Sequence, residues 1–222
     1  MTNTLIIGDT HEPFCAKGYL KFCKRIYDHH KCQRVVHIGD LVDLHSISNH
    51  DTDPNGLSPK NEILQARKKL KKWFEVFPEV YLCLGNHDKR VALKGKRDQL
   101  PNEVFKSFRE LWKLPKGWKY AYEFEFDGVL YTHGIGYSGK NAHIQAAFDN
   151  RMSTVIGHLH SVSGVQYLAN SKSTIFGMSV GSGIDVEKYA FEYGKAFRRK
   201  PIISCGVVSK TRRGTNAFVY PM

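Results

Sequence analysis

The chain has 222 residues, of which 41% are hydrophobic and 24% are charged. This composition is typical of a globular protein and excludes a disordered or fibrous chain. The longest strict apolar runs, such as Val80 to Leu84, are far shorter than a membrane span, so we expect no membrane-spanning segment and no membrane partner. We expect a single domain over residues 1–222.

The charge and the cysteines indicate partners and compartment. Lysines and arginines (33) outnumber aspartates and glutamates (21), which gives a formal net charge of +12. Such a charge favours polyanionic partners such as nucleic acid or nucleotides, although it also serves solubility alone. The five cysteines contain no CxxC pair, and the N-terminus has no basic leader or long apolar segment. We therefore expect a reducing, cytoplasmic location.

In chain order, short apolar runs alternate with helical patterns. The runs are rich in β-branched residues and predict buried strands at residues 4–7, 35–38, 80–84, 129–132 and 154–156. Helices are predicted at 16–29, 59–77, 101–113 and 141–149, and Ser58 and Pro59 suit the start of the second. Strand-like runs follow at 165–168, 175–180, 202–208 and 217–220. The fold class expected is α/β, tending to α+β because the second half is largely β.

Each of the first five strands ends in polar residues that could ligate a metal. The carboxyl ends of neighbouring strands meet at one edge of an open α/β sheet, where ligands bind. Turns need Gly, Asn and Asp but do not call for repeated histidines. The candidate ligands offer oxygen and imidazole donors without any cysteine, and they are Asp9, His11, Asp40, Asn86, His133, His158 and His160. Such a set suits Mn²⁺, Fe²⁺, Zn²⁺ or Co²⁺.

Seven candidate ligands exceed the three or four that one catalytic metal takes from a protein. Two metals sharing Asp40 would use them all, and a two-metal site clamps the attacking and leaving oxygens of phosphoryl transfer. His87 is then left to face the substrate, to stabilise developing charge and to protonate the leaving oxygen. Asp88 is a candidate to orient the His87 imidazole, and Asp43 is a candidate to support a metal ligand.

Five motifs occur in order between residues 9 and 160: Asp-x-His, Gly-Asp-x-x-Asp, Gly-Asn-His-Asp, a lone His and Gly-His-x-His. This ordered set resembles the calcineurin-like metallophosphoesterase superfamily. The resemblance implies a four-layer sandwich of two mixed β-sheets flanked by helices. It also implies one metal held by Asp9, His11, Asp40 and His160, a second held by Asp40, Asn86, His133 and His158, and His87 as the catalytic acid.

The chain departs from the protein phosphatases of that superfamily. Leu44 and His45 stand where those enzymes carry Arg-Gly, and Asp88 stands where they carry Glu. The missing arginine would grip a terminal phosphate with two parallel hydrogen bonds, so its absence disfavours a protein phosphatase. Gly-Asn-His-Asp is also seen in relatives that cut phosphodiesters.

We therefore expect a phosphodiesterase of nucleic acid or nucleotides that acts by attack of a metal-bridging hydroxide. The cofactors expected are two divalent ions, Mn²⁺ first, with Fe, Zn, Co, Ni or Mg as substitutes. One alternative is a phosphomonoesterase of phosphoproteins or small phosphates. Another is a nucleic-acid-binding module whose metals are structural. The sequence leaves oligomeric state open.

Candidate substrate contacts lie outside the metal motifs. His45 and His50 follow the Gly-Asp-x-x-Asp motif, and Ser138 lies in a Gly-rich stretch, residues 134–141, that we interpret as a turn before a helix. Arg198 and Arg199 belong to a basic segment with aromatic residues at 189, 191, 193 and 197, a mixture that suits flexible nucleic acid. Of the remaining histidines, we expect His29, His30 and His143 at the surface and His37 in the core.

Overall fold

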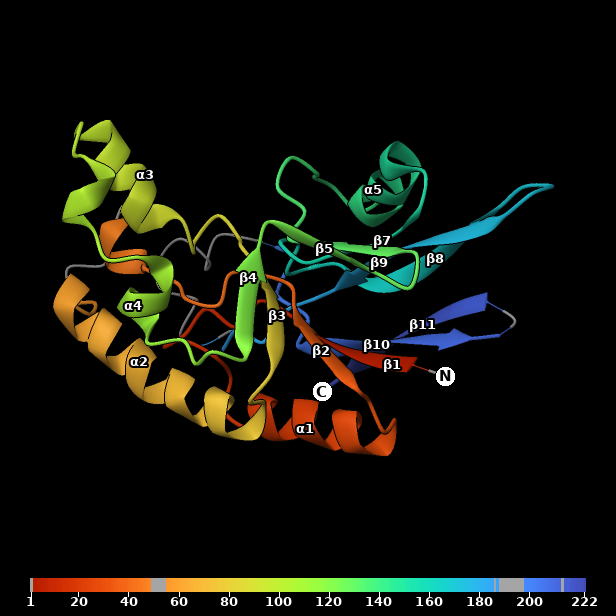
Figure 1. Cartoon of the computed structure of the whole chain (residues 1–222), viewed down its shortest axis with the longest axis horizontal. Coiled ribbons are helices and arrows are strands. Elements are labelled where there is room, and N and C mark those ends of the chain that lie inside the picture. Colours follow the sequence, from red (N-terminus) through yellow and green to blue (C-terminus); the bar gives the residue numbers. More distant parts are fainter. Residues whose placement is uncertain (1, 49–54, 186, 188–197, 213) are drawn as a thin grey trace.

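The computed structural model describes residues 2–48, 55–185, 187, 198–212 and 214–222. Its described strands form two mixed β-sheets (Figure 1). The six-stranded sheet has the order β11-β10-β1-β2-β3-β4, with β1 Thr2–Ile7, β2 Arg34–His37, β3 Val80–Cys83, β4 Trp118–Ala121, β10 Ser204–Thr211 and β11 Gly214–Pro221. The five-stranded sheet has the order β5-β6-β7-β9-β8, with β5 Glu123–Phe126, β6 Val129–Thr132, β7 Ser153–Ile156, β8 Ser163–Ala169 and β9 Thr174–Val180.

Helices flank the two sheets. The described α-helices are α1 Tyr19–His29, α2 Pro59–Val76, α3 Arg90–Arg97, α4 Phe108–Trp112 and α5 Ala142–Asn150, with 3-10 turns η1 His45–Ile47 and η2 Asn102–Val104. Helices α1 and α2 cover the outer side of the six-stranded sheet, α5 covers the five-stranded sheet, and α3 projects at the far end (Figure 1). The four-layer architecture that the family resemblance implied is therefore confirmed. Within the described part of the chain, no helix combines the length and apolarity that a membrane span requires.

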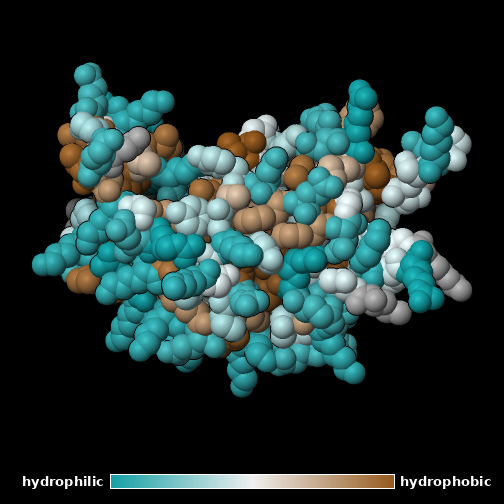
Figure 2. All heavy atoms as spheres, in the orientation of Figure 1, coloured by the Kyte–Doolittle hydropathy of each residue, from teal (hydrophilic) through white to brown (hydrophobic). Residues whose placement is uncertain are grey.

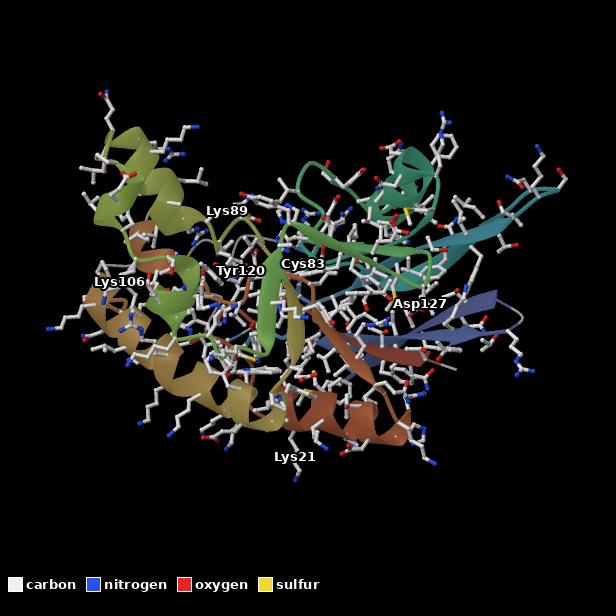
Figure 3. The ribbon with its side chains drawn as sticks, in the orientation of Figure 1. Lys21, Cys83, Lys89, Lys106, Tyr120 and Asp127 are labelled. Atoms are coloured by element: carbon white, nitrogen blue, oxygen red, sulfur yellow. The ribbon has the colours of Figure 1, made fainter. Side chains whose placement is uncertain are left out.

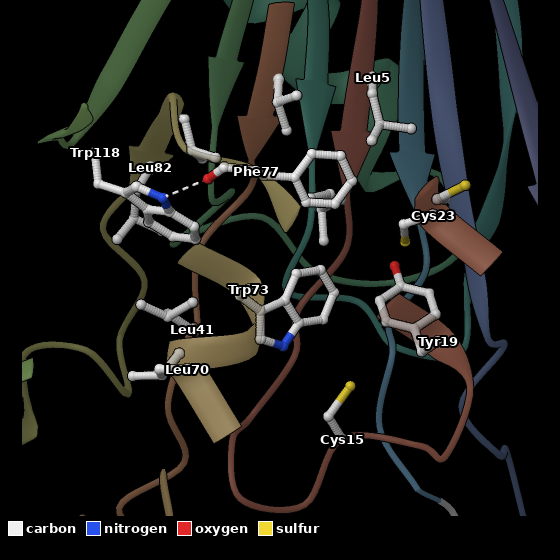
Figure 4. Close-up of a cluster of buried hydrophobic side chains, with 14 of the residues drawn as sticks. Leu5, Cys15, Tyr19, Cys23, Leu41, Leu70, Trp73, Phe77, Leu82 and Trp118 are labelled. Carbon is white, nitrogen blue, oxygen red and sulfur yellow. Dashed lines mark hydrogen bonds between the residues drawn. The ribbon is translucent and has the colours of Figure 1, made fainter. Parts of the chain in front are cut away.

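The inner strands β1 and β2 are largely apolar because both of their faces are buried. In β1, Leu5 and Ile7 join the core under α1 and α2, whereas Ile6 points between the two sheets. Figure 4 shows the helix-side core, where the indole N–H of Trp118 donates to the carbonyl of Phe77 at 2.8 Å. Strands of this kind read as continuous hydrophobic runs, which is why they were visible in the sequence.

The surface is mostly hydrophilic in the view of Figure 2, with brown residues gathered at the α3 end. Leu93 of α3, and Leu100 and Val104 after it, are exposed large hydrophobic residues. Away from that end, apolar side chains on this face are scattered between hydrophilic ones, as is usual for the surfaces of globular domains.

Three regions differ from the sequence-based prediction. Residues 101–113 do not form one helix, because Ser107 and Glu110 build a capping box that starts α4 as a separate, short helix. Helix α3 was not predicted, because its sequence is largely basic and only Gly95 of it is buried. Strands β4 and β5 were not predicted either. The starts of α1, α2 and α5 agree with the prediction to within three residues, and Ser58 caps α2 as expected.

The histidines outside the metal motifs divide between core and surface. His37 is fully buried as predicted, with its Nε2 3.0 Å from the Thr10 hydroxyl. His29 is exposed and His30 is half-buried. The expectation for His143 was wrong: it is only 8% exposed, because α5 packs closely on β9 where Gly177 has no side chain to hold the helix away.

Candidate metal centre

Loops that follow strands of both sheets bring the predicted ligands together. Ligand atoms of Asp9, His11, Asp40 and His160 all lie within 4.8 Å of one another. A second group, Asp40, His133 and His158, meets the same limit and shares Asp40 with the first. Asn86 adjoins this second group, with its Oδ1 3.0 Å from Nε2 of His133. The structure thus brings together all seven residues, in the two sets that the motifs implied, while their roles as ligands stay a prediction.

The backbone at three of these positions is strained. His11, Asp40 and His158 have φ angles of 46°, 47° and 65°, in the left-handed region that residues with a side chain rarely adopt. Each such residue costs on the order of 1–3 kcal/mol unless the surroundings hold it, and such strain gathers at functional sites. At these three positions the left-handed backbone directs the side chains toward the shared centre.

Glycines next to the ligands make room for the carboxylates. A Cβ on Gly85 would collide with the carboxylate of Asp40, and a Cβ on Gly157 would collide with that of Asp9. Gly39 has a φ of 112°, and a Cβ there would lie 2.5 Å from Nδ1 of His133. The glycines of Gly-Asp, Gly-Asn and Gly-His are therefore required by close approach across the site.

Hydrogen bonds hold both buried carboxylates. Oδ2 of Asp9 accepts from the His158 N–H at 2.9 Å and lies 3.1 Å from Nε2 of His160. Oδ1 of Asp40 accepts from the His87 N–H at 2.8 Å, and its Oδ2 lies 3.2 Å from Nε2 of His133. Burial works to raise the pKa of Asp9 and of Asp40, but the positive charge of His133 and the neighbouring hydrogen bonds lower both below the usual value. Both carboxylates are thus held in their ionised, ligating form.

His133 lies where negative charge concentrates. Its Nδ1 is 3.0 Å from the Ile38 carbonyl, and its Nε2 faces both Asn86 Oδ1 and Asp40 Oδ2. Burial works to lower the pKa of His133, yet the charges of Asp40 and then Asp9 raise it to about 9. When Nδ1–H donates to the carbonyl, a neutral ring points its Nε2 lone pair at two acceptor oxygens. That arrangement calls for a positive charge between them.

The first donor group, which consists of Asp9, His11, Asp40 and His160, also calls for a positive charge among its members. Oδ1 of Asp9 is buried and has no hydrogen-bond partner among the described residues. Nε2 of His11 and Nε2 of His160 face each other at 3.2 Å, so at most one of them can carry the hydrogen between them. Converging lone pairs on buried carboxylates and imidazoles are the donor set that borderline divalent cations prefer. The residues present therefore fit two such cations.

His87 is held by Asp43 and approached by Arg90. Its Nδ1 is 2.8 Å from the backbone carbonyl of Asp43 and 2.9 Å from Asp43 Oδ1, so Nδ1–H donates and Nε2 faces the centre. Arg90 NH1 donates to the same carbonyl at 2.8 Å, and its NH2 is 3.1 Å from His87 Nε2. Burial works to lower the pKa of His87, but the charge of Asp40 and the hydrogen bond to Asp43 raise it. His87 thus carries a proton more readily than an ordinary histidine.

The interpretation of Asp88 needs correction. Its Oδ1 accepts from the Leu41 N–H at 3.0 Å and its Oδ2 accepts from the Gly85 N–H at 2.9 Å. The carboxylate that contacts the His87 imidazole is Asp43, not Asp88. Burial, followed by the charge of Asp40, raises the pKa of Asp88 to about 7. Asp88 therefore links the Gly-Asp loop to the Gly-Asn loop, because its two carboxylate oxygens accept hydrogen bonds from a backbone amide of each loop.

Arg90 is a residue of the site that sequence reasoning missed. It follows the Gly-Asn-His-Asp motif by two positions and begins α3. The sequence offers no sign that separates it from the other basic residues of that helix. Only the contacts to Asp43 and His87 identify it.

The predicted substrate contacts are less closely tied to the centre. His45 begins η1 and is half-buried, and Ser138 is exposed in the loop between β6 and α5. That Gly-rich stretch is a turn before a helix, as predicted. Arg198 and Arg199 are exposed, whereas His50 and the aromatic residues at 189–197 lie outside the described residues. Substrate binding by these residues stays a prediction.

Comparison with known proteins gave one family and several solved structures. The family model described as calcineurin-like phosphoesterase matches residues 2–174. No curated protein matches the chain. Similar solved structures include a novel archaeal phosphodiesterase (15% identity, covering 99% of this chain and 100% of the other, TM-score 0.49). A second is Vacuolar Protein Sorting 29 from Cryptosporidium parvum (13% identity, covering 100% of this chain and 97% of the other, TM-score 0.48). A third is Pseudomonas putida nuclease MPE (12% identity, covering 99% of this chain and 87% of the other, TM-score 0.44).

Proposed function

The chain belongs to the calcineurin-like phosphoesterase family, and from that premise we propose that it hydrolyses phosphodiester bonds of nucleic acid or nucleotides. The observation that carries the proposal is the convergence of two buried donor groups on Asp40, with His87 alongside. In this proposal one divalent cation is held by Asp9, His11, Asp40 and His160, and a second by Asp40, Asn86, His133 and His158. Mn²⁺ is the first candidate, since its ligand preference matches mixed oxygen and imidazole donors.

Bound divalent cations supply Lewis acidity toward phosphoryl oxygens and lower the pKa of a water molecule. The protein contributes the fixed positions of the donors. The neighbouring histidines and backbone amides keep Asp9 and Asp40 ionised against the effect of burial. The glycines beside them leave the space that the carboxylates of Asp40 and Asp9 occupy. Positioning of this kind is the larger part of catalysis in phosphoryl transfer.

His87 is the proposed general acid. Asp43 fixes its ring with Nδ1–H as donor, which leaves Nε2 to deliver a proton to the leaving oxygen. Arg90 NH2 can donate to Nε2 only while Nε2 lacks a proton, so protonation of His87 releases this contact. The raised pKa of His87 makes the protonated form more populated than in an ordinary histidine.

Two features support a diester over a monoester substrate. Leu44, which stands where the protein phosphatases carry arginine, is buried and offers no charge to a terminal phosphate. The net charge of +12 favours polyanionic substrates. Arg90 does bring a guanidinium to the centre, but NH1 already donates to Asp43 and NH2 already faces His87.

A phosphomonoesterase is the second candidate, and the same Arg90 is the observation that favours it. If Arg90 turns from Asp43 toward the substrate, its two terminal nitrogens present the fork that grips a terminal phosphate. The two candidates differ in which ester is hydrolysed faster.

The deciding experiment strips the protein of metal, restores Mn²⁺ and compares bis-p-nitrophenyl phosphate with p-nitrophenyl phosphate. We expect no activity without metal and a higher kcat/KM for the diester with Mn²⁺. A higher value for the monoester would replace the proposal with the second candidate. Binding of Mn²⁺ and of nucleic acid without any turnover would instead indicate a binding module with structural metals.

The role of His87 is tested by His87→Ala against His29→Ala, which removes an exposed histidine far from the motifs. We expect His87→Ala to lower kcat by about 10²–10⁴-fold. The affinity for Mn²⁺, measured by calorimetry, should stay as in the parent protein. His29→Ala should leave both unchanged. Full activity in His87→Ala would refute the assignment of the acid.

A further inference from the structure

A pocket of about 200 Å³, the α3 pocket, opens beside the candidate metal centre. Asn86, a member of the second donor group, forms part of its lining, so a molecule in the pocket lies next to the centre. The apolar side chains of Ile47 and Leu93 also line it. The volume is below the 300–1,000 Å³ usual for drug-sized ligands, and it suits one segment of a larger substrate.

One side of α3 gives the α3 pocket its charge. Arg90, Lys94 and Arg97 all line it, and their spacing of four and then three residues places them on one side of the helix. No aspartate or glutamate is among the described residues that line it. Three cations around a small, partly apolar hollow favour an anionic ligand.

The three cations differ in how they are held. Arg90 is half-buried and donates to Asp43 beside His87, whereas Lys94 and Arg97 are exposed. An α-helix rises about 1.5 Å per residue, so along the axis of α3 Lys94 and Arg97 lie about 6 Å and about 10 Å from Arg90, which contacts Asp43 and His87. Arg90 is therefore held beside His87, and Lys94 and Arg97 line the part of the pocket that lies farther along α3.

We propose that the α3 pocket binds a second phosphate group, adjacent in the substrate to the phosphate that is hydrolysed. This inference rests on the proposed function and adds the substrate class: compounds with at least two phosphates, such as an oligonucleotide or a nucleoside polyphosphate. In an oligonucleotide, where a sugar separates the two phosphates, Ile47 and Leu93 would contact the apolar faces of that sugar. Lys94 and Arg97 then determine specificity for the second phosphate.

The test compares three chromogenic esters of thymidine in Mn²⁺: the 5′-(p-nitrophenyl phosphate), the same ester with a 3′-phosphate, and the p-nitrophenyl ester of the 5′-diphosphate. The quantity measured is the ratio of kcat/KM with and without the second phosphate. The 3′-phosphate represents a nucleic acid strand, and the diphosphate represents a nucleoside polyphosphate. The compound with the larger ratio, which we call the favoured arm, shows whether the second phosphate belongs to a nucleic acid strand or to a nucleoside polyphosphate.

The variant is Lys94→Ala with Arg97→Ala, and the matched control is Lys96→Ala with Lys106→Ala. The control removes the same charge from exposed residues that do not line the pocket, and Figure 3 shows Lys106 beside α4. We expect the ratio in the favoured arm to exceed one and to fall about tenfold in the variant, since hydrogen bonds to a charged phosphate are lost. The control should keep the parent ratio.

The outcomes separate the two proposals. If the parent protein hydrolyses the simple thymidine ester but the variant and the control give the same ratio, the role of the α3 pocket is refuted and the proposed function stands. If the parent protein hydrolyses none of the three diesters, the proposed function fails and the inference fails with it. A ratio that falls in the variant alone supports both.

Discussion

Gly85→Ala tests whether the close approach of two loops sets the metal centre. Gly85 has an ordinary φ, so alanine brings no backbone strain and the substitution adds one methyl group only. That methyl would overlap the Asp40 carboxylate, and it would lie 2.5 Å from Asp40 N and 2.7 Å from Asp40 Cγ. Contacts below 3.0 Å essentially never occur at a real Cβ, so Asp40 or the Gly85 loop must move.

The expected losses of stability and activity follow from these distances. Ordinary contact begins near 3.4 Å, so relief needs a shift of about 1 Å from Asp40 N and more from the overlapping carboxylate, at a residue that both donor groups share. Overpacking a buried site costs about 1–3 kcal/mol, and the stiffer unfolded chain offsets about 0.4–1 kcal/mol of it. We expect a net loss of about 1–2 kcal/mol in the free energy of unfolding. A displacement near 1 Å should also lower kcat by about 10²-fold.

The assays are urea unfolding of the metal-free protein, Mn²⁺ calorimetry and hydrolysis of bis-p-nitrophenyl phosphate. Gly164→Ala is the matched control, because a Cβ there meets nothing within 4 Å. We expect Mn²⁺ to bind Gly85→Ala at least tenfold more weakly and Gly164→Ala as tightly as the parent. Parent-like Mn²⁺ affinity and activity in Gly85→Ala would refute the geometry described for Asp40.

Two further predictions concern residues that support the centre. Asp43→Asn removes the charge that helps to raise the pKa of His87, so the pKa of His87 should fall. Because a general acid works only while protonated, the alkaline limb of the kcat–pH profile should then move to lower pH, and an unmoved limb would contradict the pairing of Asp43 with His87. Glu62 is buried and accepts from the His45 and Ser46 N–H groups at 2.8 and 2.9 Å, so Glu62→Ala should lower the free energy of unfolding by about 1–3 kcal/mol. Glu62→Gln keeps the acceptor oxygen and should lose less in the same urea titration; equal losses would show that these hydrogen bonds do not matter.

The sequence by itself determined most of the strands, the order of the motifs and the candidate ligands. Both faces of the inner strands β1 and β2 are buried, so these strands appear as largely apolar runs that end in Gly-Asp. Ligand chemistry is also local, because carboxylate and imidazole donors can be recognised by residue type. The division of these candidates into two sets that share Asp40 came from the family resemblance, and two of the donor groups found in space agree with it.

Only the tertiary structure decided which polar group serves which partner. Asp43 and Asp88 are equally acidic in the sequence, yet one binds the His87 imidazole and the other binds backbone amides. Arg90 and the α3 pocket were invisible for the same reason. A basic helix with one buried glycine has no apolar periodicity, and its position beside His87 depends on how the chain folds after β3. Residue type sets what a group can bind, whereas its partner is fixed by distances that arise only when the two sheets pack.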